Sequence, residues 1–421
     1  MWLRKYIKLK LMLKLTVVVA SLGILVVLRH TTSWRTTHMF SYSWLEITDD
    51  DVNMDAVCNC SAILLRDQEE IEKVKILAIR RDFQKTIQVP DEYYVNATQD
   101  CRSIMRKYLQ YPLSKEEEEF PLALLNGGVQ NFERLLRAIY APQNIYCVHV
   151  DKKSKPSYQS AVRAIVSCFP NVFIVSRPVD VVYASWSRVQ ADINCMADLY
   201  NSSTKWKYFL NVCGQDFPLK TNWEMVQLLR YLKGENSMES EKMPEGKKWR
   251  VTKVHEVING TIQVIKEPPP FDLPILSGNA YIVVSRGYIR SVLEDKRVQV
   301  LIEWAKDTYS PDEFLWATIQ RMPGVPGSRR PHAKFDMTDL NAIARLVKWA
   351  GHEGVDNSRD AVYPRCEGRH VRGICVYGVG DLWWVLEHRH LFANKFDTEI
   401  DPFAIYCLEK YLRRKALQKL L

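Results

Sequence analysis

The sequence predicts an α/β protein with a mainly parallel central sheet. Hydrophobic residues make up 47% and charged residues 25% of the 421 residues, which is the composition of a folded globular protein. From about Phe120 onward, short β-rich runs alternate with segments whose apolar residues recur at helical spacing. This alternation is typical of parallel strands joined by helices. Asp151 and the pair Gln215 and Asp216 directly follow two of these runs, where parallel sheets bind their ligands.

The expected elements can be followed along the chain. Residues 132–140 (FERLLRAIY) have apolar side chains on one helical face, and the β-rich run 144–150 that follows predicts a strand. Thr221 and Asn222 can cap a helix that ends at Gly234. The other expected elements are helices over 157–168, 188–200 and 288–306 and strands over 171–175, 208–212 and 280–284.

The N-terminus predicts a membrane anchor. Residues 15–28 (LTVVVASLGILVVL) are apolar, and counting from Leu9 lengthens the run to a thin-membrane span over 9–28. The positive charges before it predict that residues 1–8 stay cytoplasmic and the rest is translocated. A cleaved signal peptide is the alternative, but no A-x-A-type cleavage site follows the run. A short span favours an early secretory membrane over the plasma membrane.

Residues 29–115 are polar and irregular, which predicts a lumenal stem with some helix, followed by a catalytic domain over 116–421. Ten cysteines without a C-x-x-C pair indicate disulfides rather than zinc ligands. Four N-x-S/T sequons fit a glycosylated, lumenal body; they lie at Asn59, Asn96, Asn201 and Asn259.

Charge and motifs exclude several classes of protein. Lys and Arg total 58 and Asp and Glu 49, but five of the positive charges lie in the first fourteen residues. The body is therefore only mildly basic, and no nucleic-acid partner is expected. There is no G-x-G-x-x-G, P-loop, G-x-S-x-G or H-E-x-x-H motif, so dinucleotide, ATPase, serine-hydrolase and zinc-protease functions lack support.

Six long strings stand out between residues 134 and 397. They are RLLRAIYAPQNIYCVHVD (134–151), VVYASWSRVQADINC (181–195), YFLNVCGQDFPLKTN (208–222), KDTYSPDEFLWATIQR (306–321), ARLVKWAGHEG (344–354) and GDLWWVLEHRHLFANKFD (380–397). In this order they closely resemble one family, the core 2 branching β-1,6-N-acetylglucosaminyltransferases of mucin-type O-glycans. The resemblance covers essentially all of 120–421, and the strings over 181–195 and 344–354 are most similar to the mucin-type member that makes core 2 and core 4.

The resemblance implies a GT-A-like fold in a type II Golgi membrane protein. It implies inverting transfer of GlcNAc from UDP-GlcNAc to the 6-hydroxyl of a peptide-linked GalNAc on mucin-type glycoproteins. It also implies no metal or other cofactor, because the family lacks the D-x-D motif. The only acidic triplet here, Asp49 to Asp51, lies in the expected stem.

The resemblance also assigns site residues. Glu313, in the string S-P-D-E, matches the catalytic base that removes the acceptor hydroxyl proton. The same four residues also form an S-x-x-E capping box with Pro311 at the first helical position, which is a purely structural alternative. Arg372 and Lys395 match cations that neutralise the departing diphosphate in place of a metal.

Further positions match the donor and acceptor sites. The donor-side residues are Asp151, Lys152, Lys153, Tyr183 and Lys334, with Asp151 in the uridine-binding turn. The acceptor-side residues are Glu239, Lys248 and Trp349, where Trp349 can stack on a sugar face. Gly351 stands where some members carry a Tyr, and the smaller residue would loosen the choice of sugar on the acceptor's 3-arm.

The resemblance pairs eight of the ten cysteines, as Cys60–Cys407, Cys101–Cys168, Cys147–Cys195 and Cys366–Cys375. Cys213 matches a free thiol. Cys58 is left over, and it either stays unpaired or links two chains as a homodimer. Asn59 and Asn96 are the sequons expected to carry glycans.

One stretch departs from the family. FPLALLNGGVQNFERLLRA is about four residues shorter than the family's first strand region, with Asn126 in place of a His. Because this strand supplies donor-binding residues, an inactive glycan-binding relative is one alternative. A second is an I-branching enzyme that acts on internal galactose of lactosamine chains. A third, a disulfide-rich receptor ectodomain, would leave the S-P-D-E and NKFD strings unexplained.

Overall fold

The computed structural model describes residues 54–108, 112–127, 131–328, 342–354 and 363–418. These residues belong to the unit Asp51–Leu421. The predicted anchor, 9–28, lies outside the described residues. Within the described ranges, no helix is long and apolar enough to cross a bilayer.

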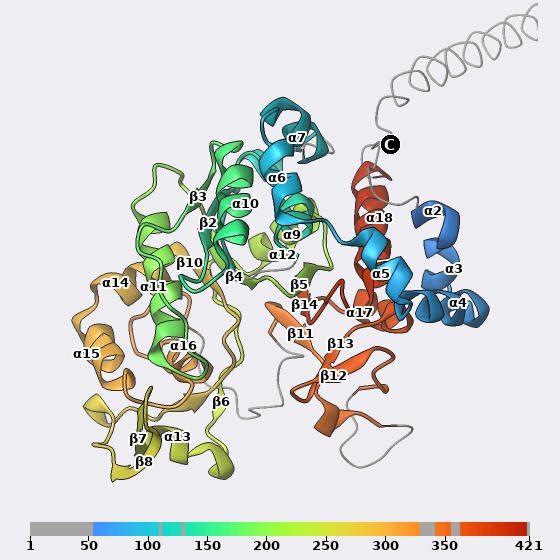
Figure 1. The fold of residues 1–421 in the computed structure, drawn as a ribbon. Helices are drawn as coiled ribbons and strands as arrows, with labels where there is room; N and C mark the ends of the chain where they lie inside the picture. The colour runs from blue at the N-terminus through green and yellow to red at the C-terminus, as the bar shows by residue number, and fades with distance from the viewer. Residues whose placement is uncertain (1–53, 109–111, 128–130, 329–341, 355–362, 419–421) are drawn as a thin grey trace, which may run out of the picture. The chain divides into compact units, whose positions relative to one another are not determined.

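A five-stranded sheet forms the centre of the fold (Figure 1), with strand order β10-β4-β1-β2-β3. β1 pairs in parallel with β2 and β4, and β2 pairs in parallel with β3. Only β10 runs antiparallel, against β4. The sheet is therefore mainly parallel, as predicted. Its strands are β1 (Leu122–Gly127), β2 (Ile145–His149), β3 (Val172–Ile174), β4 (Tyr208–Cys213) and β10 (Val283–Ser285).

Helices cover both faces of this sheet, because its strands carry apolar side chains on both sides. On β2, Tyr146 and Val148 pack in one core with α9 (Phe132–Ile139), α10 (Pro156–Ser167) and α12 (Asn222–Tyr231). Ile145 and Cys147 point into a second core with α11 (Trp186–Tyr200), α14 (Arg286–Glu294), α15 (Lys296–Ala305) and α16 (Leu315–Ile319).

A second, three-stranded sheet carries the C-terminal part of the site. Its order is β11 (Arg345–Val347), β14 (Phe392–Asn394) and β5 (Asp216–Pro218). Three two-stranded ribbons accompany it: β12 (Arg369–Val371) with β13 (Ile374–Val376), β6 (Glu241–Lys242) with β9 (Leu276–Ser277), and β7 (Lys253–Glu256) with β8 (Gly260–Ile265). The remaining elements are η1 (Glu245–Lys247), α13 (Trp249–Thr252), η2 (Pro270–Asp272), η3 (Pro311–Glu313), η4 (Ala350–His352), η5 (Val379–Asp381), α17 (Leu382–Glu387) and α18 (Pro402–Gln418).

The described part of the expected stem is helical and folded onto the domain. Its helices are α2 (Met54–Val57), α3 (Cys60–Leu64), α4 (Gln68–Ala78), α5 (Arg81–Ile87), α6 (Asp91–Ala97) and α7 (Cys101–Tyr108), followed by α8 (Lys115–Glu118). Ile71 and Val74 of α4 are buried in one core with Phe403 and Leu408 of α18, and α6 packs on α10. The boundary expected at residue 116 is thus no structural boundary, because these short helices bury their apolar faces against the domain.

Two local predictions need comment. Thr221 caps α12 in a capping box with Glu224, as predicted. The helix expected over 288–306 is two helices, α14 and α15, because the Asp295 side chain accepts a hydrogen bond from the Arg297 N–H and starts a new helix.

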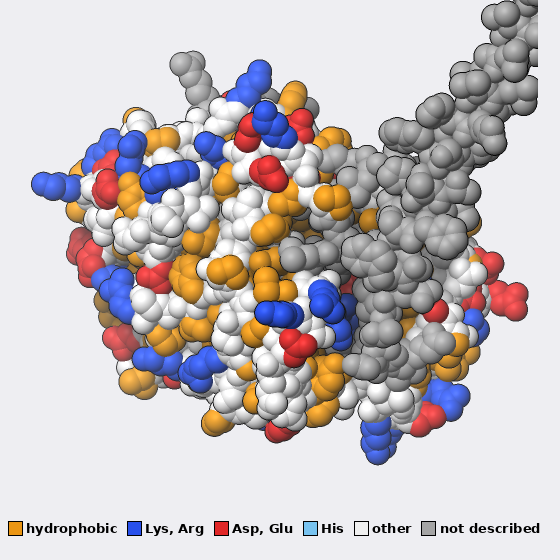
Figure 2. Space-filling model, turned by 90° about the horizontal axis from the view of Figure 1, so that it is seen from above, with side chains coloured by type: hydrophobic (Ala, Val, Ile, Leu, Met, Phe, Trp, Pro, Cys, Tyr) orange, Lys and Arg blue, Asp and Glu red, His pale blue; other side chains and the backbone are white. Residues whose placement is uncertain are grey.

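Charges of both signs are interspersed over the face drawn in Figure 2. This agrees with the nearly equal numbers of basic and acidic residues after the first fourteen positions.

Candidate active site

Glu313 ends the short 3₁₀ helix η3, which begins at Pro311 as predicted. The capping box does not form, because Ser310 has a φ of 47° and its side chain makes no cap hydrogen bond. The Glu313 carboxylate pairs instead with the guanidinium of Arg250, and the Glu313 side chain is 39% exposed. The carboxylate is therefore available at the surface rather than used by its own helix.

A buried charged cluster lies beneath Glu313. Arg188 of α11 pairs with Asp192 at 2.5 Å, and Asp192 is fully buried. Burial raises the pKa of Asp312 to about 6; the charge of Arg188 opposes this rise, and the charges of Glu313 and Asp192 add to it. Asp312 is a neighbour of the candidate base that sequence reasoning did not single out.

The two predicted cations lie near each other although 23 residues separate them in the sequence. Arg372 lies in the turn between β12 and β13 with a φ of 54°, and Lys395 directly follows β14. Burial lowers the pKa of Lys395, and the nearby charge of Arg372 lowers it further. The Arg372 guanidinium lies 5.2 Å from the centroid of the Tyr183 ring. Arg372, Lys395 and Tyr183, all predicted to bind the donor, are therefore neighbours.

Tyr309 connects this group to Glu313. Burial raises the pKa of Tyr309, and Tyr183, Arg250 and Glu313 all act on its hydroxyl, Tyr183 also through a hydrogen bond. The Arg250 guanidinium lies 5.4 Å from the Tyr309 ring centroid. A continuous line of aromatic and charged side chains therefore runs from the candidate base to the candidate diphosphate cations.

The turn after β2 is fastened to the loop that leads to Tyr183. Asp151 accepts a hydrogen bond from the Lys153 N–H at 3.1 Å, and the Lys153 ammonium pairs with Asp180 at 3.1 Å and with Asp151 at 3.5 Å. The Lys152 N–H donates to the Val179 carbonyl at 3.2 Å. In the sheet, Gly127 of β1 lies opposite both His149 and Cys213, so this turn and Cys213 flank the same edge.

Asp216, beside the free thiol of Cys213, is fully buried and belongs to a structural network. It pairs with Arg345 at 2.8 Å and accepts hydrogen bonds from the Asn394 side chain at 2.9 Å and the Cys213 N–H at 2.5 Å. Burial raises the pKa of the Cys213 thiol to about 12. Asp216 thus holds β5, β11 and β14 together, a role that the sequence pattern did not reveal.

The acceptor-side predictions divide into two groups. Glu239 accepts a hydrogen bond from Asn279 at 3.0 Å, and the neighbouring Gly278 N–H donates to the Glu313 carbonyl at 2.8 Å, so Glu239 belongs to the wall that carries the base. Trp349 is 38% exposed and pairs with Ile374 in a β-bridge, near Arg372.

Lys248 and Gly351 are the remaining acceptor-side positions. Lys248 pairs with Glu245 on its own turn, with both side chains at least half exposed. A side chain at Gly351 would meet open space. Lys334 lies outside the described residues.

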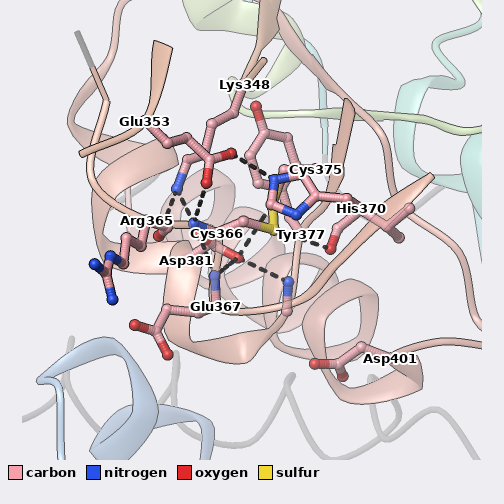
Figure 3. Close-up of a disulfide and its surroundings, with 12 residues drawn as sticks. Lys348, Glu353, Arg365, Cys366, Glu367, His370, Cys375, Tyr377, Asp381 and Asp401 are labelled. Atoms are coloured by element: carbon pink, nitrogen blue, oxygen red, sulfur yellow. Dashed lines mark hydrogen bonds and ion pairs between the residues drawn. A yellow bond between two sulfur atoms is a disulfide. The ribbon is translucent and has the colours of Figure 1, made fainter. Parts of the chain in front are cut away.

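A network of a disulfide, hydrogen bonds and an ion pair supports the Arg372 turn (Figure 3). The Cys366–Cys375 disulfide closes the β12–β13 hairpin. Glu353 accepts a hydrogen bond from the Cys366 N–H at 2.9 Å and pairs with His370 at 2.8 Å. These contacts join the loop after Trp349 to the hairpin that carries Arg372.

Beside the disulfide, Lys348 and Asp381 form a buried ion pair at 2.6 Å, with side-chain exposures of 0% and 1%. Asp381 also accepts hydrogen bonds from the N–H groups of Glu367 and Gly378. Sequence reasoning missed this pair, because its two members are 33 residues apart and no local pattern relates them.

All four expected disulfides are present. Cys58 and Cys213 are free. The Cys58 sulfur lies 3.6 Å from that of Cys407 and 3.8 Å from that of Cys60, and Cys58 is only 4% exposed. Because the thiol is buried, it cannot reach a second chain in this conformation. The structure therefore argues against a homodimer linked through Cys58.

The two predicted glycosylation sites and the groups of possible metal ligands lie in the described part of the chain. Asn59 and Asn96 are both exposed, and the Asn59 side chain caps α3 by accepting from the Ala62 N–H. In the described part of the chain, the groups of three potential metal ligands all include disulfide cysteines. None contains Asp151, Asp216 or Glu313.

The mainly parallel central sheet defines an α/β protein. A carboxylate and two cations placed near the edge of such a sheet are the arrangement of an enzyme. The Core-2/I-Branching enzyme family matches residues 121–386, and this chain belongs to that family. A β-1,3-galactosyl-O-glycosyl-glycoprotein β-1,6-N-acetylglucosaminyltransferase of Homo sapiens is 52% identical over 384 residues, covering 89% of each chain. The enzymes of that name numbered 3 from Ovis aries and Homo sapiens are 55% and 54% identical, each covering 85% of this chain and 83% of the relative.

Proposed function

We propose that this protein transfers GlcNAc from UDP-GlcNAc in β-1,6 linkage to the GalNAc of core 1 and core 3 mucin-type O-glycans, with inversion and without a metal. The observation that carries the proposal is 52–55% identity, over most of the chain, to enzymes named β-1,3-galactosyl-O-glycosyl-glycoprotein β-1,6-N-acetylglucosaminyltransferases. The line of contacts that runs from Glu313 through Arg250, Tyr309 and Tyr183 to Arg372 supports it.

Glu313, Arg372 and Lys395 would each have a separate role in the transfer reaction. The Glu313 carboxylate removes the proton from the acceptor 6-hydroxyl as that oxygen attacks the anomeric carbon of GlcNAc from the face opposite UDP. Arg372 and Lys395 offset the negative charge that develops on the β-phosphate, because fixed cations in a partly dry cleft stabilise it without reorganising. The turn at Asp151 takes the uridine.

The acceptor would lie between two walls. Glu239, on the wall that carries Glu313, accepts hydrogen bonds from sugar hydroxyls, and the half-exposed ring of Trp349 offers a face on which a pyranose ring can stack. The free space at Gly351 admits more than one sugar on the 3-arm. This supports action on both core 1 and core 3.

The first strand supports an active enzyme over an inactive relative, despite the shortened sequence. β1 pairs with β4 along its whole length and with β2 from Ala123 onward. Asn131, at the start of α9, donates to the Phe396 carbonyl at 3.3 Å and accepts from Thr398 at 3.0 Å. β1 is therefore a fully paired strand of the central sheet, and the start of α9 is held against the segment that follows Lys395.

We further propose a single-pass type II Golgi membrane protein with a lumenal catalytic domain. The apolar run 9–28 after a basic tail supports the anchor. The four disulfides support an oxidising lumen.

A panel of acceptors tests the function. The full chain in detergent is incubated with UDP-GlcNAc and core 1, core 3 or lactosamine acceptors, and the linkage of each product is determined. β-1,6 product from core 1 and core 3 is expected. Product from lactosamine alone would identify an I-branching enzyme, and glycan binding without turnover would identify an inactive relative.

A further inference from the structure

Arg250 is the cation in contact with the candidate base. Its guanidinium pairs with Oε2 of Glu313, and its side chain is 20% exposed. It comes from α13, 63 residues before Glu313, and neither the family resemblance nor the relatives' names assign it a role.

Several contacts fix Arg250 on the segment that leads into η3. The Tyr309 N–H donates to the Arg250 carbonyl at 3.2 Å, and the guanidinium lies over the Tyr309 ring. The Trp249 ring packs on Tyr309 with centroids 4.8 Å apart, and the His255 N–H donates to the Asp307 carbonyl at 2.8 Å. α13 and the strand after it are thus joined at several points to the segment 307–309 that precedes η3.

The charges around Glu313 explain why a cation is needed there. Asp312 on its own turn and Asp192 of α11 are both acidic, and Arg188 of α11 is already paired with Asp192. A lone carboxylate next to these acids would be repelled and free to rotate. The guanidinium of Arg250 supplies both the opposing charge and a fixed direction.

We propose that Arg250 is a positioning residue for the transfer reaction. By binding Oε2 of Glu313, it holds the carboxylate in one orientation and leaves Oε1 to receive the proton of the acceptor hydroxyl. This role rests on the proposed function, since it requires Glu313 to be the base.

A misdirected base weakens chemistry much more than binding, because a displacement near 1 Å can cost about 10²-fold in rate. We therefore expect Arg250→Met to lower kcat by about 10²-fold, with KM for UDP-GlcNAc and for the acceptor within about threefold of wild type. Methionine keeps an apolar stem next to Tyr309 and removes the charge and the N–H donors of the guanidinium. Arg250→Lys, which restores the charge, should recover about tenfold of the loss.

Two further variants separate positioning from general damage. Arg297→Ala breaks a comparable ion pair, with Asp295 at 2.7 Å, away from the site, and should leave kcat unchanged. Arg250→Met combined with Glu313→Gln should be no slower than Glu313→Gln alone, because residues that act as a unit are not additive.

Three results would overturn the role. They are full kcat in Arg250→Met, an equal loss in Arg250→Lys and Arg250→Met, or losses that multiply in the double variant. Absence of wild-type turnover would refute the proposed function and this role together, whereas wild-type turnover with a fully active Arg250→Met refutes this role alone.

Discussion

Replacing Cys60 by Ser should leave the protein almost as stable as wild type, because Cys58 can take its place. The Cys60–Cys407 bridge spans 347 residues. The Cys58 sulfur already lies 3.6 Å from that of Cys407, with a separation of 349 residues. A Cys58–Cys407 bridge would therefore close a loop of the same size.

The magnitude follows from that loop size. In the chain-entropy model, a bridge across about 350 residues stabilises the fold by about 6 kcal/mol, and a change of two residues in the loop has a negligible effect. Burial raises the pKa of the Cys58 thiol to about 12, so the native thiol is a poor nucleophile. The substitute bridge should therefore form during oxidative folding rather than afterwards.

Peptide mapping without reduction identifies the bridge, and urea unfolding measures the stability. We expect Cys60→Ser to carry a Cys58–Cys407 bridge and to lose at most ~1–2 kcal/mol, whereas Cys407→Ser and the double variant Cys58→Ser/Cys60→Ser lose about 4–6 kcal/mol. If Cys60→Ser retains a free Cys58 and is as unstable as the double variant, the reasoning from proximity fails.

Three further predictions concern the reaction. Glu313→Gln should lower turnover by ~10²–10⁴-fold with unchanged UDP affinity by calorimetry, and near-normal turnover would remove it as the base. Transfer should persist in excess EDTA and not rise with manganese, and Arg372→Ala should lower turnover at least ~10²-fold; inhibition by EDTA that manganese reverses would contradict the two-cation mechanism. Because burial lowers the pKa of Lys395, its charge is lost at a lower pH than that of an ordinary lysine. Turnover should therefore fall on the alkaline side, and Lys395→Arg, which stays charged, should extend activity to higher pH; coinciding pH profiles would argue against this role.

Local patterns in the sequence were sufficient to predict the main strands of the sheet and the helices that cover it. The run 144–150 contains β2 and the segment 132–140 contains α9, because burial on both faces of a strand and on one face of a helix leaves a periodic signal. The Thr221 cap could also be predicted from the sequence, because its hydrogen-bond donors and acceptors lie within four residues. The resemblance added the disulfide pairing, which spacing alone does not specify.

Contacts between distant segments were not visible in this way. Ser310 to Glu313 has the sequence of a capping box, yet Arg250 from another helix takes the carboxylate. Residues 54–108 are polar enough to suggest a stem, yet Ile71 and Val74 of α4 are buried in one core with α18.

The sequence alone therefore predicts where strands and helices occur and which residue types the site contains, because these depend on neighbours within a turn or a strand. The partners of those residues depend on chain segments brought together by the core. Arg250 with Glu313, Lys348 with Asp381, and Arg345 with Asp216 lie 63, 33 and 129 residues apart. Their pairing becomes defined only when the packed core brings these segments together. For Lys348 with Asp381 and Arg345 with Asp216, packing also removes both charges from water.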